Sequence, residues 1–398
     1  MSLVDTPRAN RLHIGIYGKR NVGKSSLVNA ITGQSVAVVS DVAGTTTDPV
    51  YKAMELYPIG PVVFIDTAGV DDDGDLGELR VDRTRDATRK TDIALVVFTA
   101  EPDVEAEWIA DLTRRGIPVV AVVNKADELG DAEALRAEVA RRFGVRTVVV
   151  SARTGENVTA IREAIITELP DDEPASITGA LAEPGDLVLL VMPQDIQAPK
   201  GRLILPQVQT LRDLLDKKCL VMSCTTDKLT DTLAALSRPP KLIITDSQVF
   251  PVVHAAKPAE SLLTSFSVLF ASYKGDITAF VEGAEGIGRL TPTSRVLIAE
   301  SCTHAPLEED IGRVKIPALL RRRFGDGLTI DIVAGPDPLP ELASYDLVIH
   351  CGGCMFNRRH VLSRIQEATD LGLPITNYGI TIAYLSGILD KISLPAAR

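Results

Sequence analysis

The sequence predicts an α/β protein in which three units, each with a mainly parallel sheet, follow one another along the chain. Apolar stretches of strand length alternate with stretches of helical periodicity, as they do where crossover helices join parallel strands. Polar or cysteine-containing loops follow several of these strands, and α/β sheets build their sites at the carboxyl ends of parallel strands. An acidic, proline-bounded segment at residues 170–174 separates the first unit from the others.

The composition is that of a globular protein too long for one core. The chain has 398 residues, of which 45% are hydrophobic and 24% charged, and its net charge is −11. This charge argues against a partner held through nucleic-acid phosphates. We find no apolar run of signal-peptide or membrane-spanning length, so we expect a soluble, cytoplasmic protein with no membrane partner. Five cysteines, an odd number, favour thiols over disulfides.

The first unit opens with a phosphate-binding motif. An apolar strand at residues 12–17 runs into GKRNVGKS at 18–25, and a helix-like run follows at 26–32. This is the pattern GxxxxGK(S/T) in the context that it requires. Main-chain N–H groups of such a loop hold phosphates, Lys24 reaches the terminal phosphates, and Ser25 ligates magnesium.

A second strand end adds to the phosphate site. The apolar strand at 61–65 ends in DTAG at 66–69. Asp66 can hold magnesium through water, and the Gly69 amide can sense the γ-phosphate. The next residue is Val70, where Ras-like proteins place the glutamine that orients the attacking water, so another group must assist hydrolysis.

Two later strand ends predict a site for the base. The strand at 117–123 ends in NKAD at 124–127, and the Asp127 carboxylate can accept from guanine N1–H and the exocyclic amine, donors that adenine lacks. The strand at 147–150 ends in Ser-Ala-Arg at 151–153, a base-contacting turn. The fold class is therefore a P-loop GTPase domain, at residues 1–170, followed by two smaller parallel α/β domains.

One loop of this unit resembles a particular group of GTPases. The segment SDVAGTTTD at 40–48, together with Asn21, is similar to the TrmE, Era and EngA group. The resemblance implies that Thr46 completes the magnesium shell, and that Asn21 and the backbone before Thr45 hold a potassium ion in place of an arginine finger. A plain loop role for Asn21 stays open. The predicted catalytic residues are Lys24, Thr46, Asp66 and Gly69; the predicted nucleotide-binding residues are Gly18, Asn21, Val22, Gly23, Lys24, Ser25, Ser26, Thr45, Thr46, Asp66, Gly69, Asn124, Lys125, Asp127, Ser151 and Ala152.

The middle of the chain predicts a small parallel α/β unit without a phosphate motif. Cys219 and Cys224 flank an apolar strand there, and we interpret both as packing residues. The segment 194–207 is too apolar at 203–205 for a simple loop, and a contact surface between subunits would use it. The predicted strands are 187–192, 219–223 and 241–245, and the predicted helices are 207–217 and 227–236.

Three of the five cysteines lie in two short segments near the carboxyl terminus. They are CTH at 302–304 and HCGGC at 350–354, each following a predicted parallel strand, 295–299 or 347–350. Three thiolates are one short of the four ligands that a zinc ion or a four-iron cluster takes. Spacing alone does not separate zinc from an iron-sulfur cluster, and an isolated CxxC can also be a redox pair.

The motifs in this order resemble one family, the FeFe-hydrogenase maturation GTPases called HydF. Besides the GTPase motifs, the resemblance is carried by APKGR at 198–202, by CTH at 302–304 with DIGR at 310–313, and by HCGGC at 350–354. It covers essentially the whole chain. It implies a dimerisation domain at residues 180–260, an iron-sulfur domain at 264–398, and a 4Fe-4S cluster bound by Cys302, Cys351 and Cys354.

The resemblance also implies a role as scaffold or carrier of the two-iron precursor of the hydrogenase active site. The implied partners are the apo catalytic subunit of FeFe-hydrogenase, the radical-SAM maturases HydE and HydG, and a second copy of the chain. A carrier needs a metal centre with an open or weakly held position. Asp195, His304 and His350 are candidates for the weak fourth ligand.

Two other functions remain compatible with parts of the sequence. The first is an RNA- or ribosome-associated GTPase like Era or TrmE, although the one late GxxG, at 283–286, contains a glutamate and has no basic rim. The second is a regulatory GTPase stabilised by zinc.

Overall fold

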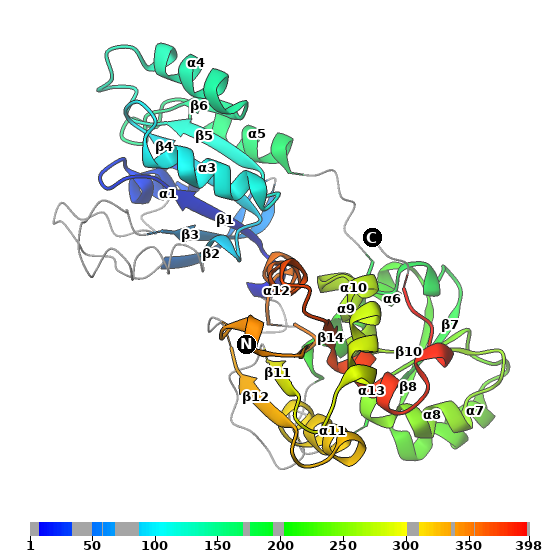
Figure 1. Cartoon of the computed structure of the whole chain (residues 1–398). Coiled ribbons are helices and arrows are strands. Elements are labelled where there is room, and N and C mark those ends of the chain that lie inside the picture. The colour runs from blue at the N-terminus through cyan, green and yellow to red at the C-terminus, as the bar shows by residue number, and fades with distance from the viewer. Residues whose placement is uncertain are drawn as a thin grey trace. The chain divides into compact units, whose positions relative to one another are not determined.

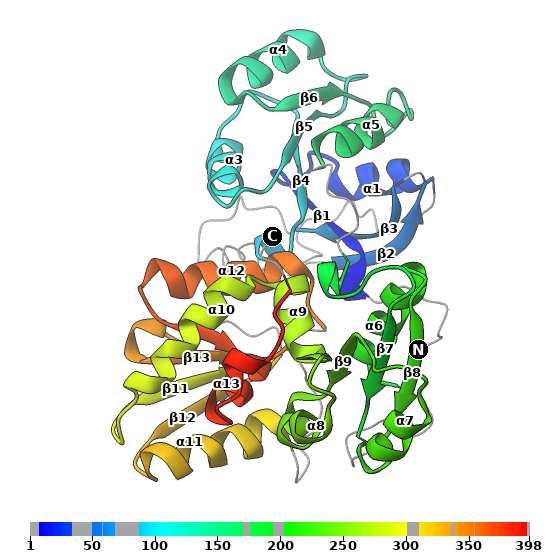
Figure 2. The same ribbon diagram turned by 90° about the vertical axis from the view of Figure 1, so that its right-hand side faces the viewer.

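The computed structural model describes residues 8–33, 50–57, 59–67, 87–169, 176–193, 203–300, 310–335, 339–353 and 355–395. The chain divides into two compact units, residues 1–172 and 173–398. Figures 1 and 2 show the elements of each unit in two views.

The first unit is a six-stranded sheet with helices packed on both faces. The strand order is β2-β3-β1-β4-β5-β6, and all pairs are parallel except β2 with β3. Helices α1 and α5 share one hydrophobic core with the sheet, and α3 and α4 share another. Because both faces are covered, β4 and β5 are buried along their whole length. The elements are β1 Leu12–Tyr17, α1 Lys24–Thr32, β2 Val50–Leu56, β3 Gly60–Asp66, β4 Ile93–Phe98, α3 Val104–Arg114, β5 Val119–Val123, α4 Ala132–Phe143, β6 Arg146–Val149 and α5 Thr159–Glu168.

The second unit contains two four-stranded parallel sheets. Their orders are β10-β9-β7-β8 and β12-β11-β13-β14. The elements of the first sheet are β7 Leu187–Val191, α6 Leu205–Asp216, β8 Leu220–Cys224, α7 Leu229–Ala235, β9 Leu242–Thr245, α8 Phe250–Ala256, β10 Leu262–Ser265 and α9 Phe266–Lys274. Those of the second are α10 Ile277–Ala284, β11 Arg295–Ala299, α11 Ile316–Phe324, β12 Thr329–Val333, β13 Leu347–His350, α12 Arg358–Asp370, β14 Ile375–Asn377 and α13 Tyr378–Leu385. The predicted fold class, a P-loop domain followed by smaller parallel sheets, is confirmed.

The two sheets of the second unit share one hydrophobic core. Leu189 and Ile243 of the first sheet belong to the same buried cluster as Leu297 and Ile349 of the second. The predicted boundary between domains 180–260 and 264–398 falls at β10, which pairs with β9 and so completes the first sheet. The proposed division into a dimerisation and a cluster-binding domain stays a prediction.

The GxxG at 283–286 lies at the end of α10, where the helix packs against β14. A Cβ on Gly283 would lie 1.9 Å from the Ile375 carbonyl oxygen, so only glycine allows this approach. The motif is thus explained by helix–strand packing, and it gives no support to an RNA-binding GxxG loop.

We expect Gly283→Ala to destabilise the second unit strongly. The added methyl would force α10 away from β14, which should lower the free energy of unfolding by about 3 kcal/mol and the melting temperature by roughly 10 °C. Differential scanning calorimetry measures this. Gly352→Ala is the matched control, because a Cβ there meets no atom within 4 Å. Equal melting temperatures of the two variants would contradict the close packing.

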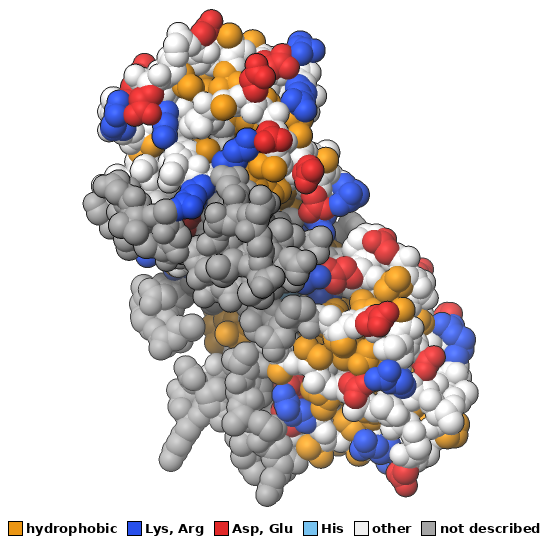
Figure 3. Space-filling view, turned by 60° about the vertical axis from the view of Figure 1, so that its left-hand side comes forward, with side chains coloured by type: hydrophobic (Ala, Val, Ile, Leu, Met, Phe, Trp, Pro, Cys, Tyr) orange, Lys and Arg blue, Asp and Glu red, His pale blue; other side chains and the backbone are white. Residues whose placement is uncertain are grey.

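The described surface mixes charges of both signs. On the face shown in Figure 3, basic and acidic side chains lie among one another over the described residues. None of the helices in the described ranges is long and apolar enough to cross a membrane.

Candidate functional site

The loop between β1 and α1 has the conformation that its glycines and Asn21 allow. Asn21 has a φ of 60° and Gly23 a φ of 91°, both in the left-handed region. A Cβ on Gly23 would lie 2.5 Å from Nδ2 of Asn124, so the loop passes directly beside the base-site residue. Helix α1 begins at Lys24 and directs its first N–H groups into the loop.

The ammonium group of Lys24 is held inside this loop. The side chain is buried, and Nζ donates to the carbonyl oxygens of Gly18 at 2.7 Å and Lys19 at 2.9 Å. These carbonyls are exchangeable partners that a phosphate can replace. The lysine is therefore preorganised at the amino terminus of α1, where an anion binds best.

The two described residues of the predicted magnesium site meet directly. Ser25 Oγ donates to Asp66 Oδ2 at 2.8 Å, which joins the start of α1 to the end of β3. Burial raises the pKa of Asp66, and the Ser25 hydrogen bond and the charge of Lys24 oppose this shift. The other predicted residues of this side, Thr45, Thr46 and Gly69, lie outside the described residues.

Asn124 joins the phosphate loop to the base-contacting turn. Its buried side chain donates from Nδ2 to the Val22 carbonyl at 2.8 Å and accepts at Oδ1 from the Ala152 N–H at 3.0 Å. The Asn124 side chain therefore fixes the position of the phosphate loop relative to the base-contacting turn.

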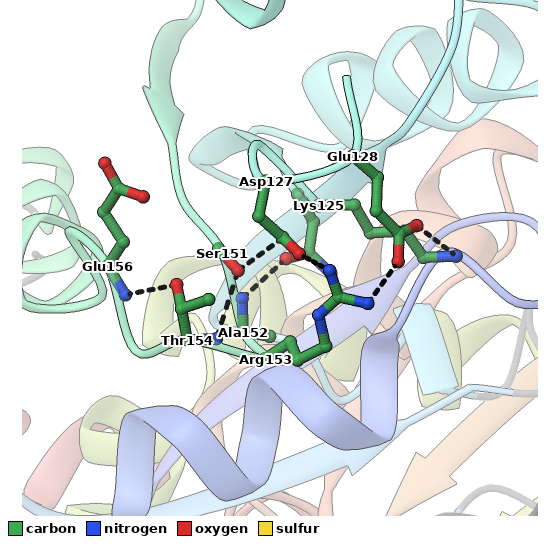
Figure 4. A network of polar contacts seen from close by, with 9 residues as sticks. Lys125, Asp127, Glu128, Ser151, Ala152, Arg153, Thr154 and Glu156 are labelled. Carbon is green, nitrogen blue, oxygen red and sulfur yellow. Dashed lines mark hydrogen bonds and ion pairs between the residues drawn. The ribbon is translucent and has the colours of Figure 1, made fainter. Parts of the chain in front are cut away.

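The Asp127 carboxylate is oriented by two donors, as Figure 4 shows. Ser151 Oγ donates to Oδ1 at 2.6 Å, and the Arg153 guanidinium donates to Oδ2. Arg153 also donates to Glu128 at 2.7 Å. The Ser151 hydrogen bond first, and Arg153 with it, lower the pKa of Asp127, so the carboxylate is an anion able to accept from a base. The sequence placed Arg153 in this turn but gave it no role, and its contact with Asp127 is a finding of the structure.

A row of polar residues follows the carboxyl edge of the second sheet in the second unit. Ala299 of β11 pairs with His350 of β13, which pairs with Asn377 of β14. The next residues along these strands are Glu300, Cys351 and Tyr378. The parallel strands predicted at 295–299 and 347–350 are confirmed, and they are direct neighbours in the sheet. Cys351 N–H donates to the Ala299 carbonyl at 3.0 Å, so the strand that leads to Cys302 lies directly beside Cys351.

The side chains of this row are linked to the DIGR segment at 310–313. Arg313 Nε donates to Glu300 Oε2 at 3.0 Å, and Tyr378 Oη donates to Glu300 Oε1 at 3.4 Å. A Cβ on Gly312 would lie 1.9 Å from Tyr378 Oη, so glycine makes room for the phenol. Desolvation and the negative charges of Cys351 and Glu300 raise the pKa of Tyr378. The segment therefore packs at the rim of the cysteine site.

The loop after Cys351 turns its backbone toward the sulfur. Gly353 has a φ of 64°, and its N–H donates to Cys351 Sγ at 3.5 Å. Such N–H···S contacts stabilise a metal-bound thiolate. The donor type, the N–H to sulfur contact and the neighbouring strand that leads to Cys302 fit a thiolate-bound cluster.

His350 is the other predicted cluster ligand within the described residues. It is fully buried, its Nδ1 lies 2.6 Å from the Cys351 carbonyl oxygen, and its Nε2 lies 3.3 Å from Arg364. No group of three histidine, cysteine or acidic side chains that could hold a metal occurs in the described ranges. The remaining predicted ligands, Asp195, Cys302, His304 and Cys354, lie outside these ranges.

The edge strand β8 exposes apolar side chains. In the part of the chain that the structure describes, β8 pairs only with β7. Leu220 and Met222 on β8 are 55% and 41% exposed, and Leu215 on α6 is 54% exposed. An edge strand with exposed apolar side chains favours pairing with another chain. Cys219 is buried and Cys224 is half-buried here, as packing residues are.

Comparisons with known families match three parts of the chain. Residues 278–394 match the hydrogen maturase F tetramerization domain, and residues 177–275 match the hydrogen maturase F dimerization domain. Residues 13–125 match the 50S ribosome-binding GTPase family. The two hydrogen maturase F matches together span more than half of the chain.

Curated relatives match the first unit. GTPase Der of Wolinella succinogenes is 37% identical over 168 residues, which are 39% of this chain and 36% of the relative. The tRNA modification GTPase MnmE of Chromobacterium violaceum is 37% identical over 158 residues, 39% of this chain and 34% of the relative. The chain thus spans about a third of the length of these relatives. Among solved structures, Era of Aquifex aeolicus bound to GDP and aluminium fluoride is 20% identical with a TM-score of 0.37, covering 63% of this chain and 99% of that chain.

Proposed function

The chain belongs to the hydrogen maturase F family, and from this premise we propose that it hydrolyses GTP and carries the two-iron precursor of the FeFe-hydrogenase active site on a 4Fe-4S cluster. The observation that carries the proposal is the register at the carboxyl edge of the second sheet, which puts Cys351 beside the strand leading to Cys302. The first unit is a GTPase domain, and this fold binds GTP and magnesium.

In the proposed GTP site each described residue has a separate task. Lys24 would exchange its carbonyl partners for the terminal phosphates. Ser25 and Asp66, which now contact each other, would hold magnesium, Asp66 through water. Asp127 accepts from the two guanine donors while Ser151 and Arg153 orient it. We further assign to Thr46 the second magnesium contact and to Asn21 a potassium ion in place of an arginine finger; Gly69 would sense the γ-phosphate.

In the proposed cluster site Cys302, Cys351 and Cys354 would supply thiolates. Three thiolates are one ligand short of four, so the cluster would have a position for an exchangeable ligand such as one from the cargo. Asp195, His304 and His350 stay candidates for the weak protein ligand. Apo-hydrogenase would receive the cargo, and HydE and HydG would supply it. Nucleotide-dependent change in residues 41–48 and 70–78, which lie outside the described ranges, would set the affinity for these partners.

Iron binding tests the cluster directly. Anaerobic reconstitution of the full chain with iron and sulfide should give a visible absorption band, a reduced-state EPR signal and about four irons per chain. Cys351→Ser should lower the iron content at least fivefold because one of three thiolates is lost, whereas Cys219→Ser should leave it unchanged. GTP turnover should be the same in both variants. Anaerobically purified protein that holds stoichiometric zinc would point to the zinc-stabilised alternative.

We propose that two copies of the chain associate through β8. Leu220→Lys with Met222→Lys would place two charges on the exposed edge, and the dimer should dissociate to the 42.7 kDa chain at micromolar concentration. Light scattering after size exclusion measures the mass. Val252→Lys on α8, 53% exposed in the wild type, is the matched control. If the double variant keeps the wild-type mass, association runs through another surface.

A further inference from the structure

A buried arginine contacts the last residue of β13, the strand that leads into Cys351. Arg364 on α12 is 2% exposed, and its guanidinium contacts His350 Nε2 at 3.3 Å and donates to the Gly335 carbonyl at 3.1 Å. The guanidinium also lies 5.0 Å from the centre of the Phe356 ring. Three contacts from different segments therefore fix its position.

The contact with Arg364 determines where the proton of the His350 ring lies. An arginine guanidinium stays protonated and can only donate, so Nε2 of His350 must accept. The ring proton is then on Nδ1, which donates to the Cys351 carbonyl oxygen at 2.6 Å.

Helix α12 also holds the turn that follows Cys351. A Cβ on Gly353 would lie 2.8 Å from Val361 Cγ2, so the turn rests directly on the helix. The Phe356 N–H donates to the Gly353 carbonyl at 3.0 Å and closes the turn. One helix thus supports Cys351 twice, through the strand end before it and through the turn after it.

We propose that Arg364 and His350 form a strut that positions Cys351 for metal binding, with His350 as a positioning residue and not the fourth cluster ligand. The inference rests on the proposed function, because it takes Cys351 as a ligand. Ligation by His350 would need one of two nitrogens that are both in use, and it would remove an acceptor from a buried guanidinium. The strut fixes the peptide plane of Cys351, and with it the direction of the Gly353 N–H toward the sulfur.

Hydrogen exchange of the metal-free full chain tests the strut without the cluster. In Arg364→Met and His350→Leu the strut is lost, and amides in the peptide 347–357 should exchange roughly tenfold faster than in the wild type. His350→Asn keeps a donor near the position of Nδ1, so its exchange rate should stay within about twofold of wild type. Arg322→Met, on the exposed side of α11, is the matched control for an arginine-to-methionine change.

Nitrogen NMR of ¹⁵N-histidine-labelled protein gives a second readout. The chain has five histidines, and the signal missing in His350→Asn identifies His350. We expect a neutral ring with the proton on Nδ1, both before and after cluster reconstitution.

The outcomes separate the strut from the cluster. The proposed strut would be wrong if amide exchange in the peptide 347–357 were unchanged in both His350→Leu and Arg364→Met. It would also be wrong if NMR placed the His350 ring proton on Nε2. If Arg364→Met does not fold, the same exchange measurement on Arg364→Lys and on the two His350 variants tests the strut. Faster exchange in these variants together with a wild type that takes up no iron would support the strut and refute the cluster.

Discussion

Replacing Lys24 with alanine is expected to lower kcat for GTP hydrolysis about a thousandfold. The ammonium group is held at the amino terminus of α1 by two loop carbonyls, so it needs only to exchange these acceptors for phosphate oxygens. A charge positioned in this way is worth about this much in a transition state. Phosphate release at saturating GTP measures the effect, and iron content after reconstitution should be unchanged.

Lys19 supplies the control for this prediction. It lies in the same loop, but its ammonium group pairs with Asp103 at 3.2 Å and with Glu105 at 3.7 Å. Lys19→Ala should change kcat by less than about threefold, because the Lys19 ammonium group is paired with two carboxylates, exposed Asp103 and buried Glu105. Equal losses in the two lysine variants would mean that the loop, and not the Lys24 charge, was disturbed.

Asp127→Asn is expected to weaken GTP binding on the order of a hundredfold and to improve binding of xanthosine triphosphate. An amide can accept from one guanine donor but opposes the other, and a lost charge-assisted pair costs about 3 kcal/mol. Xanthine has a carbonyl in place of the exocyclic amine, so it accepts from the new amide. Fluorescent nucleotide titration measures both affinities.

Glu156→Gln controls for the loss of one negative charge near the same turn. Its backbone N–H, not its carboxylate, contacts Thr154. GTP affinity should be unchanged in this variant. If Asp127→Asn still preferred GTP to xanthosine triphosphate, another group would have to recognise the base.

The sequence predicts which segments form the nucleotide site because its motifs are contiguous. Each motif follows an apolar strand, and parallel strands bring their carboxyl ends to one edge, so Ser25 and Asp66 meet as expected. The role of Arg153 could not be predicted, because nothing in a basic residue of a turn shows that it will reach back to Asp127 across two strand ends.

The ligands of the cysteine site stay a prediction from the sequence, and the residues that support Cys351 could not be predicted. The sequence places Cys351 after a strand, but the neighbourhood of Glu300 and Tyr378 depends on strand order and register, which short apolar runs do not encode. Arg364 gave no signal either, since one basic residue on an amphipathic helix usually lies on the solvated face. Here its guanidinium is buried because His350 and Gly335 offer acceptors.

The common core of the two sheets in the second unit has a consequence for how this region melts. Side chains from β7 and β9 complete the packing of β11 and β13, so a fragment starting at residue 264 would expose apolar surface and lose its fold. On heating, the β8 edge of the first sheet and the edge of the second sheet beside Cys351 should therefore unfold in a single cooperative transition. Under the proposed function, association through β8 and metal binding at Cys351 would therefore both depend on one folding equilibrium.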